Sequence, residues 1–398
     1  MATRGDMTGE HGSDEDISVE TQATQLGRDP QRYFGFVNMP VYRGSTVLYP
    51  NAESLESHDI PYTYGRPSNP TTRALEEALA KLEGGARTFL APSGLSAVST
   101  LLLAFAEAGG HILITDSVYF PTRRFAGKVL KRLGVEVEYY DPLIGGGIAA
   151  LIRPNTKLVF TESPGSQTFE VQDIPAICAA ARGRNVPVAI DNTWATPIFF
   201  RAFDHGVNIS VQAATKYIVG HADALLGAIT CDAATAPAVA ATHEALGLCV
   251  NGEDAFLALR GLRTLPVRLK QHQASALAMA EWLGTRPEVA RVLHPALPDC
   301  PGHELWKRDF LGSSGLFTIV LKPQPKEAVR RFLNALRLFG MGYSWGGYES
   351  LIVPFDCAHS RTATKWQEDG PALRLHIGLE DVSDLKRDLQ RGFAALAG

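Results

Sequence analysis

Short apolar runs alternate with longer amphipathic stretches from about residue 70 to residue 217 of this chain. The short runs have the length of buried strands, and the stretches between them have the spacing of helices. Alternation of this kind predicts a mostly parallel sheet with helices on both faces, an α/β fold. The predicted strands are residues 87–91, 111–115, 135–139, 157–161, 188–190 and 207–211, and the predicted helices are residues 72–83, 98–106, 122–133 and 175–184.

The pattern changes after residue 252, where a second and smaller α+β domain is predicted. Residues 253–283 have the leucine spacing of one long helix, and a boundary is expected near its middle. The division of the chain is therefore an N-terminal arm and extended segment (1–60), a sheet domain (61–260) and a C-terminal domain (261–398). In the last of these, strands are predicted at residues 315–321, 341–344 and 373–377, with helices at 326–339 and 384–397.

Composition and charge narrow the class of protein. An apolar fraction of 45% with 20% charged residues is ordinary for a soluble globular chain. The net charge of -4 offers no basic stripe for nucleic acid, and no apolar run reaches the roughly 20 residues of a membrane helix. Five widely spaced cysteines without a C-x-x-C suit the reducing cytoplasm, and the polar residues 1–16 predict a disordered arm, not a signal peptide.

Two residues at strand ends carry the first chemical hypothesis. Asp191 and Lys216 each follow a predicted buried strand, and open α/β sheets bind ligands at the carboxyl ends of their strands. Apolar neighbours around Lys216 would lower the pKa of its amine and make it a usable nucleophile. An ordinary solvated lysine is the alternative interpretation.

Other candidate groups are weaker one by one. Tyr64 and Arg66 stand in a proline-rich loop, where they could bind an anion or form a surface turn. Gly94 and Leu95 open a helix whose free backbone N–H groups could bind a phosphate, although small residues are also common there for packing. Tyr119 follows a predicted strand at the same sheet edge as Asp191.

Arg374 alternates with two leucines on a predicted strand, and it could bind a carboxylate or form a structural ion pair. Neither G-x-G-x-x-G after the first strand nor G-x-x-x-x-G-K-[ST] occurs, so a nicotinamide dehydrogenase and a nucleotide hydrolase both lose support.

Taken together, these motifs resemble those of the Cys/Met-metabolism family of pyridoxal-phosphate enzymes, and more closely its bacterial cystathionine β-lyases. The similarity extends from about Leu26 to Phe393. It implies the aspartate-aminotransferase-like fold, known as fold type I. The stretches that carry it are Tyr64-Gly65-Arg66, Glu162-Ser163-Pro164-Gly165-Ser166, Asp191-Asn192-Thr193-Trp194, Gln212-Ala213-Ala214-Thr215-Lys216-Tyr217, Tyr343-Ser344-Trp345-Gly346-Gly347-Tyr348-Glu349-Ser350 and Arg374-Leu375-His376-Ile377-Gly378-Leu379-Glu380-Asp381.

The resemblance implies a set of residue roles around pyridoxal 5′-phosphate. Lys216 would bond covalently to the cofactor and later act on the substrate proton, while Asp191 would pair with the ring nitrogen and Tyr119 would stack on the ring. The phosphate would be bound by Gly94, Leu95 and Thr215 of the same subunit and by Tyr64 and Arg66 of a neighbouring subunit. The substrate would be bound by Arg374, Ser344, Trp345 and Tyr64. Ala213 and Leu95 depart from residues frequent in the wider family, a small hydroxyl residue and a methionine.

The implied reaction is β-elimination of L-cystathionine to homocysteine, pyruvate and ammonia, with cystine and other S-substituted cysteines as further substrates. The sequence Tyr343-Ser344-Trp345 and the end of the motif at Gly165-Ser166 favour the β-lyase branch. A γ-acting relative (cystathionine γ-synthase, γ-lyase or homoserine-ester sulfhydrylase) is the first alternative. A cofactor-free Schiff-base aldolase is the alternative from another class. The resemblance also implies a homodimer as the catalytic unit, commonly paired into a tetramer.

Overall fold

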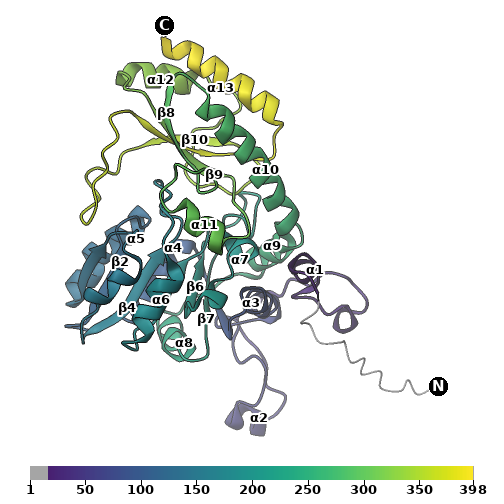
Figure 1. The fold of residues 1–398 in the computed structure, drawn as a ribbon. Coiled ribbons are helices and arrows are strands. Elements are labelled where there is room, and N and C mark those ends of the chain that lie inside the picture. Colours follow the sequence, from purple (N-terminus) through teal and green to yellow (C-terminus); the bar gives the residue numbers. More distant parts are fainter. Residues whose placement is uncertain (1–16, 398) are drawn as a thin grey trace.

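Two sheets organise the chain in the computed structural model, which describes residues 17–397 (Figure 1). The larger sheet has seven strands in the order β1-β7-β6-β5-β4-β2-β3. Its neighbours are parallel except at β7, which runs antiparallel to both β1 and β6. The predicted mostly parallel sheet is therefore confirmed. Its strands are β1 (Arg87–Ala91), β2 (His111–Thr115), β3 (Glu136–Tyr140), β4 (Thr156–Glu162), β5 (Val188–Asp191), β6 (Ile209–Gln212) and β7 (Gly227–Cys231).

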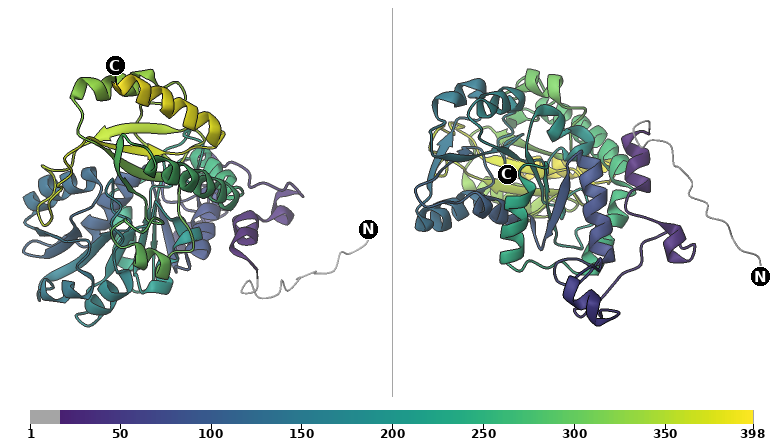
Figure 2. Two further views of the ribbon diagram at one scale, coloured as in Figure 1. Left: turned by 45° about the horizontal axis from the view of Figure 1, so that its top comes forward. Right: turned by 90° about the horizontal axis from the view of Figure 1, so that it is seen from below.

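Helices cover both faces of this sheet (Figure 2). Apolar side chains of α3 (Pro70–Glu83) and α6 (Ile174–Arg182) belong to one core, and those of α4 (Gly94–Ala104) and α8 (Ala236–Ala245) belong to another. Alternate residues of one strand point to opposite faces, so β4 contributes Val159 to the first core and Phe160 to the second.

Two helix starts are fixed by side-chain caps. Asn69 caps α3 by accepting hydrogen bonds from the backbone N–H groups of Thr71 and Thr72. Ser93 caps α4 by accepting from Ser96 N at 3.1 Å. As a result α4 begins directly at the end of the strand-to-helix turn, four residues earlier than its apolar spacing indicated. Three of the four residues before Val98 are small or polar, and Leu95 alone does not set a helical period.

The second sheet is antiparallel, in the order β10-β11-β9-β8, and lies above the first in Figure 1. It consists of β8 (Val289–Leu293), β9 (Leu316–Leu321), β10 (Leu351–Phe355) and β11 (Ala372–His376). Its core is shared with α10 (Leu265–Gly284), α12 (Lys326–Ala335) and α13 (Val382–Ala397). This is the predicted α+β arrangement, and the boundary at residue 260 stays a prediction.

Three sequence predictions of elements are wrong in detail. The expected strand at residues 341–344 is a loop, and Ser344 within it has φ +85°, which an extended strand excludes. The expected single helix at 253–283 is two, α9 (Gly252–Leu262) and α10, because Pro266 lacks the N–H that a continuous helix needs. The expected helix at 122–133 is α5 (Phe120–Phe125) followed by a π turn and a 3₁₀ turn.

Residues 17–69, before α3, lie at the edge of the molecule (Figures 1 and 2). Of these, α1 (Val19–Gln25) packs against α3 and α10, whereas α2 (Ala52–Ser57) projects from the body. The predicted disordered arm, residues 1–16, lies outside the described residues. The short elements not yet mentioned are α7 (Thr196–Phe199), α11 (His303–Asp309) and 3₁₀ turns at Pro30–Tyr33, Gly145–Ala150 and Ala202–His205.

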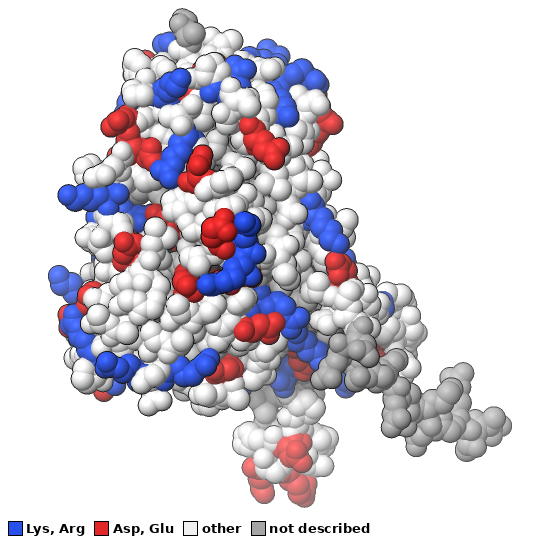
Figure 3. Space-filling view, in the orientation of Figure 1, with Lys and Arg blue, Asp and Glu red and all other residues white. Residues whose placement is uncertain are grey.

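Charge is spread over the surface without a single-sign stripe on the face drawn in Figure 3, where acidic and basic side chains alternate. Within residues 17–397, none of the helices combines the length and apolar character needed to cross a bilayer. The same residues contain no group of three or more His, Cys, Asp or Glu side chains that could hold a metal ion.

Candidate active site

One threonine joins the two turns that carry Asp191 and Lys216. Asp191 ends β5, and Thr193 donates to its Oδ1 from both backbone N (3.0 Å) and Oγ1 (2.5 Å). The same Thr193 Oγ1 accepts from Ala213 N at 2.8 Å, three residues before Lys216. Since β5 and β6 are parallel neighbours, this bridge fixes the acid-bearing turn against the lysine-bearing turn. Thr193 was quoted in a motif but given no role from sequence, because only the fold brings it to Ala213.

Lys216 lies in a largely enclosed position and points at the second domain. Its Nζ donates to Ser344 Oγ at 2.7 Å and lies 5.3 Å from the centre of the Trp345 ring. Burial, with a further contribution from the Arg374 guanidinium and opposed by Asp191, lowers the pKa of Lys216 to about 8. A sizeable fraction of such amines is uncharged near neutral pH, and an uncharged amine can act as a nucleophile or accept a proton.

The loop that meets Lys216 is tightly packed. Ser344 has φ +85°, a conformation that costs a non-glycine residue free energy and is concentrated at functional sites. Gly346 has φ +88°, and a Cβ there would lie only 2.9 Å from the carbonyl carbon of Lys216. The imidazole of His376 on β11 accepts from Gly346 N at 3.1 Å. The loop therefore packs directly against the backbone of Lys216, and the hydrogen bond to His376 fixes it to β11.

Arg374 approaches the same loop from β11. It is 9% exposed, and its NH2 donates to the carbonyl oxygen of Ser344 at 3.3 Å. Its neighbours Leu373 and Leu375 are fully buried in the core of the second domain, as the alternation predicted. Among the ion pairs of residues 17–397, none includes Arg374. Its guanidinium is therefore open to a carboxylate, and the structural ion pair considered as an alternative is not formed.

Two partly buried acids lie side by side at the sheet edge. Glu162 is the register partner of Asp191 across β4 and β5, and its Oε2 accepts from the backbone N of Tyr119 at 2.7 Å. Burial raises the pKa of Asp191. Burial and the neighbouring Asp191 raise the pKa of Glu162 well above its usual range. Sequence reasoning assigned no role to Glu162, although its place at a strand end was an available signal.

The start of α4 lies against the lysine turn. A Cβ on Gly94 would lie 2.4 Å from the Cβ of Ala213, so only glycine permits this approach. In the described part of the chain, the backbone N–H groups of Gly94 and Leu95 have no hydrogen-bond partner, as expected for the first turn of a helix. Such N–H groups, aligned with the helix dipole, bind phosphate.

Thr215 is engaged elsewhere. Its Oγ1 donates to the carbonyl oxygen of Leu226 at 3.1 Å and accepts from Leu226 N at 2.9 Å. A hydroxyl has one proton to donate, so a phosphate contact from Thr215 requires it to exchange this partner. The role given to Thr215 stays a prediction.

Tyr64 and Arg66 lie apart from the other predicted residues. Both are exposed, and Tyr64 forms an isolated bridge with Thr46. Arg66 acts electrostatically on His243 of α8. Within the described chain, no hydrogen bond or ion pair joins either residue to Lys216, Asp191 or another predicted site residue. Tyr119, in contrast, is at the same sheet edge as Asp191, and the residue is 44% exposed.

The residues present suit pyridoxal phosphate. The Asp191 carboxyl is partly buried, and no cation is bonded to it in the described chain. A protonated ring nitrogen would supply one. The free N–H groups at the start of α4 suit the phosphate, and the unpaired Arg374 suits the carboxylate of an amino acid.

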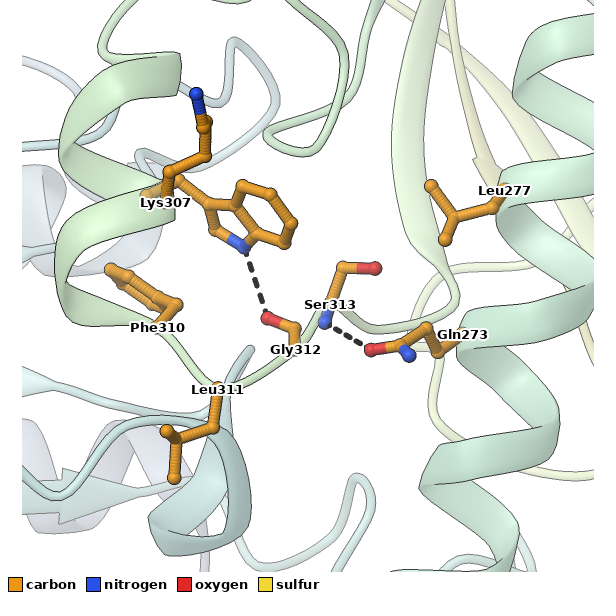
Figure 4. A pocket seen from close by; sticks show the side chains of 8 residues that line it. Gln273, Leu277, Lys307, Phe310, Leu311, Gly312 and Ser313 are labelled. Atoms are coloured by element: carbon orange, nitrogen blue, oxygen red, sulfur yellow. Dashed lines mark hydrogen bonds between the residues drawn. The ribbon is translucent and has the colours of Figure 1, made fainter.

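A different hollow, of about 280 Å³, lies between α10 and α11 (Figure 4). Trp306 Nε1 donates to Gly312 O at 3.0 Å and Ser313 N donates to Gln273 Oε1 at 2.7 Å on its walls. Since none of the predicted site residues lines this hollow, it is separate from the candidate active site.

Comparison with known proteins identifies the family. Residues 20–394 match the family described as "Cys/Met metabolism PLP-dependent enzyme". The chain belongs to this family. The resemblance drawn from the motifs is confirmed, and so is pyridoxal phosphate as the cofactor.

Individual relatives agree along nearly the whole chain. A Rhizobium johnstonii protein provisionally named as a cystathionine β-lyase is 54% identical over 96% of this chain and 97% of its own length. The Escherichia coli cystathionine β-lyase MetC is 45% identical over 96% of this chain and 99% of its own. The crystal structure of MetB from Corynebacterium glutamicum has a TM-score of 0.89 at 30% identity, covering 96% of this chain and 99% of that one. The predicted fold type I architecture is thus confirmed.

Proposed function

We propose that this chain is a pyridoxal-phosphate-dependent carbon–sulfur β-lyase that cleaves L-cystathionine to homocysteine, pyruvate and ammonia. The observation that carries the proposal is the contact of Lys216 Nζ with Ser344 Oγ at 2.7 Å, beside an Arg374 that donates to the carbonyl of the same serine. An amine and a carboxylate-binding group therefore meet in one place. The relatives named as cystathionine β-lyases support this substrate.

The cofactor, when bound, supplies an electron-withdrawing ring that weakens the bonds at the α-carbon of an amino acid. In this chain Lys216 Nζ would hold it covalently, Asp191 would bind the ring nitrogen, and Tyr119 would stack on the ring. Gly94 and Leu95 would bind the phosphate through backbone N–H groups, with Thr215 as a further donor once it leaves Leu226.

The protein side chains then position the substrate and move one proton. Arg374 binds the α-carboxylate through the two parallel bonds that a guanidinium offers, with the backbone at Ser344 and Trp345 beside it. Lys216 Nζ accepts the α-proton as a free amine, for which its lowered pKa of about 8 prepares it. The hydrogen bond to Ser344 Oγ holds Nζ in one direction while it does so.

Product identification tests the proposal. Purified protein incubated with L-cystathionine should release pyruvate, whereas a γ-acting relative would release 2-oxobutyrate. Lys216→Ala should abolish pyruvate release while the protein still folds, and Lys270→Ala, which removes an exposed lysine on α10, should leave it unchanged. 2-Oxobutyrate as the main product, or normal turnover by Lys216→Ala, would contradict the assignment. A colourless protein without a cofactor band reducible by borohydride would favour the cofactor-free aldolase.

We further propose that the catalytic unit is a homodimer, paired into a tetramer, in which Tyr64 and Arg66 reach the phosphate of the neighbouring subunit. Their exposure, and the lack of a hydrogen bond or ion pair to the other site residues of the described chain, support a role outside their own subunit. The segment before them carries exposed apolar side chains, including Phe34 at 98% and Leu48 at 85%, which suit a protein partner. A cytoplasmic location is proposed because the five cysteines are unpaired.

A further inference from the structure

The connection between β10 and β11 reaches from the second domain down to the first (Figure 1). We call residues 356–371 the strap. In Figure 1 it is the yellow loop that descends beside α5. It leads at its end into β11, whose third residue is Arg374. A contact that fixes the strap to the first domain therefore also constrains β11 of the second domain.

Asp116 holds the middle of the strap. Three successive backbone N–H groups of the strap, those of Thr362, Ala363 and Thr364, donate to its carboxylate at 2.8 to 3.1 Å. The hydroxyls of Thr362 and Thr364 donate to it as well, at 3.2 and 2.8 Å. The carboxylate is fully buried, and hydrogen bonds to an ionised acceptor are the strong ones. Burial alone would raise the pKa of Asp116, but the donors from Thr362 and Thr364 outweigh it and lower the pKa.

Asp116 also begins the turn that ends at Tyr119. Arg123 on α5 donates from NH2 to both Oδ1 and the carbonyl oxygen of Asp116, at 2.5 and 3.0 Å. Arg123 NH1 reaches Thr362 Oγ1 at 3.4 Å, and the guanidinium lies 3.6 Å from the centre of the Tyr139 ring. The start of the Tyr119 turn and the strap are thus bound to the same carboxylate.

A second acid holds the strap without touching that turn. Glu170 accepts from Arg361 of the strap at 3.1 Å, and Thr168 Oγ1 also contacts this arginine. Glu170 therefore offers a natural control, because its loss would loosen the strap and leave the residues between Asp116 and Tyr119 bonded as before.

We propose that Asp116 is a positioning residue: by tying the strap to the turn that carries Tyr119, it fixes Tyr119 and, through β11, Arg374 in one relative position. The two groups belong to different domains, and the substrate must meet both. This inference rests on the proposed function for what Tyr119 and Arg374 do, but the physical link itself is independent of it.

Hydrogen exchange on the cofactor-free protein measures the link directly. In Asp116→Ala, amide exchange should become at least about tenfold faster in two peptides. In residues 360–366 the amides lose their acceptor, and in residues 117–121 the turn is no longer tied to the strap through Asp116. Glu170→Gln should accelerate the first peptide only. Asp356→Asn, an exposed strap acid that accepts from Ala358 N, should change neither. Asp116→Asn keeps one acceptor oxygen and should give intermediate rates, which also covers a failure of Asp116→Ala to fold.

Steady-state kinetics with L-cystathionine then test whether Asp116 positions Arg374 for the substrate or only holds the strap in place. Asp116→Ala should raise KM about tenfold, equivalent to ~1.4 kcal/mol, with a smaller change in kcat, because Arg374 is no longer aligned for the carboxylate. Asp116→Asn should recover part of this loss, and Glu170→Gln should change KM less than Asp116→Ala.

Either of two results would overturn the proposal. Unchanged exchange at residues 360–366 in both Asp116 variants would mean that this carboxylate does not hold the strap. The second result is that Asp116→Ala accelerates exchange at residues 360–366 but not at 117–121, and has the same KM as Glu170→Gln. Asp116 would then hold the strap without positioning Tyr119 or Arg374. Failure of the wild-type protein to produce pyruvate would refute the proposed function and leave the exchange result standing.

Discussion

Lys216 combines burial with a nearby positive charge, and both act in the same direction. Removing an amine from water disfavours its ammonium form, and the Arg374 guanidinium disfavours it again. Asp191 opposes them but does not cancel them. The environment that favours the uncharged amine, which proton transfer requires, therefore makes the charged amine destabilising in the folded, cofactor-free protein.

This destabilisation predicts that the difference in stability between wild type and a variant without the Lys216 amine depends on pH. The pKa of Lys216 is about 8 in the folded protein against 10.5 ordinarily. Between these values the unfolded chain binds a proton that the folded chain lacks, so the free energy of unfolding rises with pH across this window and is flat below it. In cofactor-free protein, Lys216→Met should be more stable than wild type by about 1–3 kcal/mol at pH 7. Its advantage should shrink as the pH rises from 8 to 10.5.

Urea unfolding of both proteins at several pH values checks this. Lys270→Met is the matched control, because Lys270 is exposed and forms a surface pair with Glu20. Groups common to wild type and variant cancel in the difference, and the lost bond to Ser344 Oγ adds a constant. A difference that does not change between pH 8 and pH 10.5 would show that burial leaves the Lys216 pKa near its ordinary value.

At this scale, the sequence reveals residues at strand ends better than the residues that position them. Asp191 and Lys216 follow apolar runs, so the edge they share could be predicted from local pattern alone. Thr193 and His376 act through Ala213 and Gly346, which are distant in sequence, and only the folded chain brings these pairs together. Glu162 stands between: its strand end was visible, but its pairing with Asp191 depends on strand order.

The loop at residues 343–350 shows how an element can be misread from its residues. Tyr343 favours a strand by propensity, yet its neighbour Ser344 takes φ +85°. The contacts of Ser344 Oγ with Lys216, and of its carbonyl with Arg374, hold this backbone in place. Tertiary contacts outweigh propensity here, which is expected where strain serves a site.

Two substitutions at Ser344 separate strain from chemistry. Ser344→Gly and Ser344→Ala both remove the hydroxyl that accepts from Lys216, so both should lower turnover, roughly tenfold for the loss of one such bond. Glycine adopts positive φ without strain, whereas alanine keeps the strain. Ser344→Gly should therefore be more stable than Ser344→Ala by about 0.5–1 kcal/mol, less than the strain itself because glycine also gains freedom in the unfolded chain.

Thermal unfolding of the two variants tests the predicted difference in stability, and steady-state kinetics tests the predicted loss of turnover. Equal stability would mean that the backbone at residue 344 relaxes in the alanine variant. Wild-type turnover in either variant would mean that the Lys216 amine needs no hydroxyl to hold it.

At the scale of the molecule, the two domains meet at the candidate site from opposite sides. The first contributes Asp191, Lys216 and Tyr119 from strand ends, and the second contributes Ser344 and Arg374. Alternation of strands and helices was enough to predict the sheet of the first domain. The second domain was predicted less completely, since β8 and β10 have no strong period of their own and form through pairing with β9 and β11.

The site of one chain lacks two of the groups expected around the phosphate, and this gives the broadest prediction. Tyr64 and Arg66 are exposed, and among the described residues no hydrogen bond or ion pair joins them to Lys216. If each subunit lends Arg66 to its neighbour, Arg66→Ala and Lys216→Ala subunits should complement each other. A mixed dimer then contains one site with both residues intact and one site with neither.

Co-refolding the two variants in equal amounts should restore about a quarter of the wild-type activity, because half of the dimers are mixed and each holds one intact site. Each variant refolded alone is the control, and both should remain near background at limiting cofactor. If Arg66 served its own subunit, every mixed dimer would have one site without Arg66 and one without Lys216, and no activity would return. The measurement thus decides between the two arrangements, because a site assembled across the interface can be rebuilt by mixing and a site within one chain cannot.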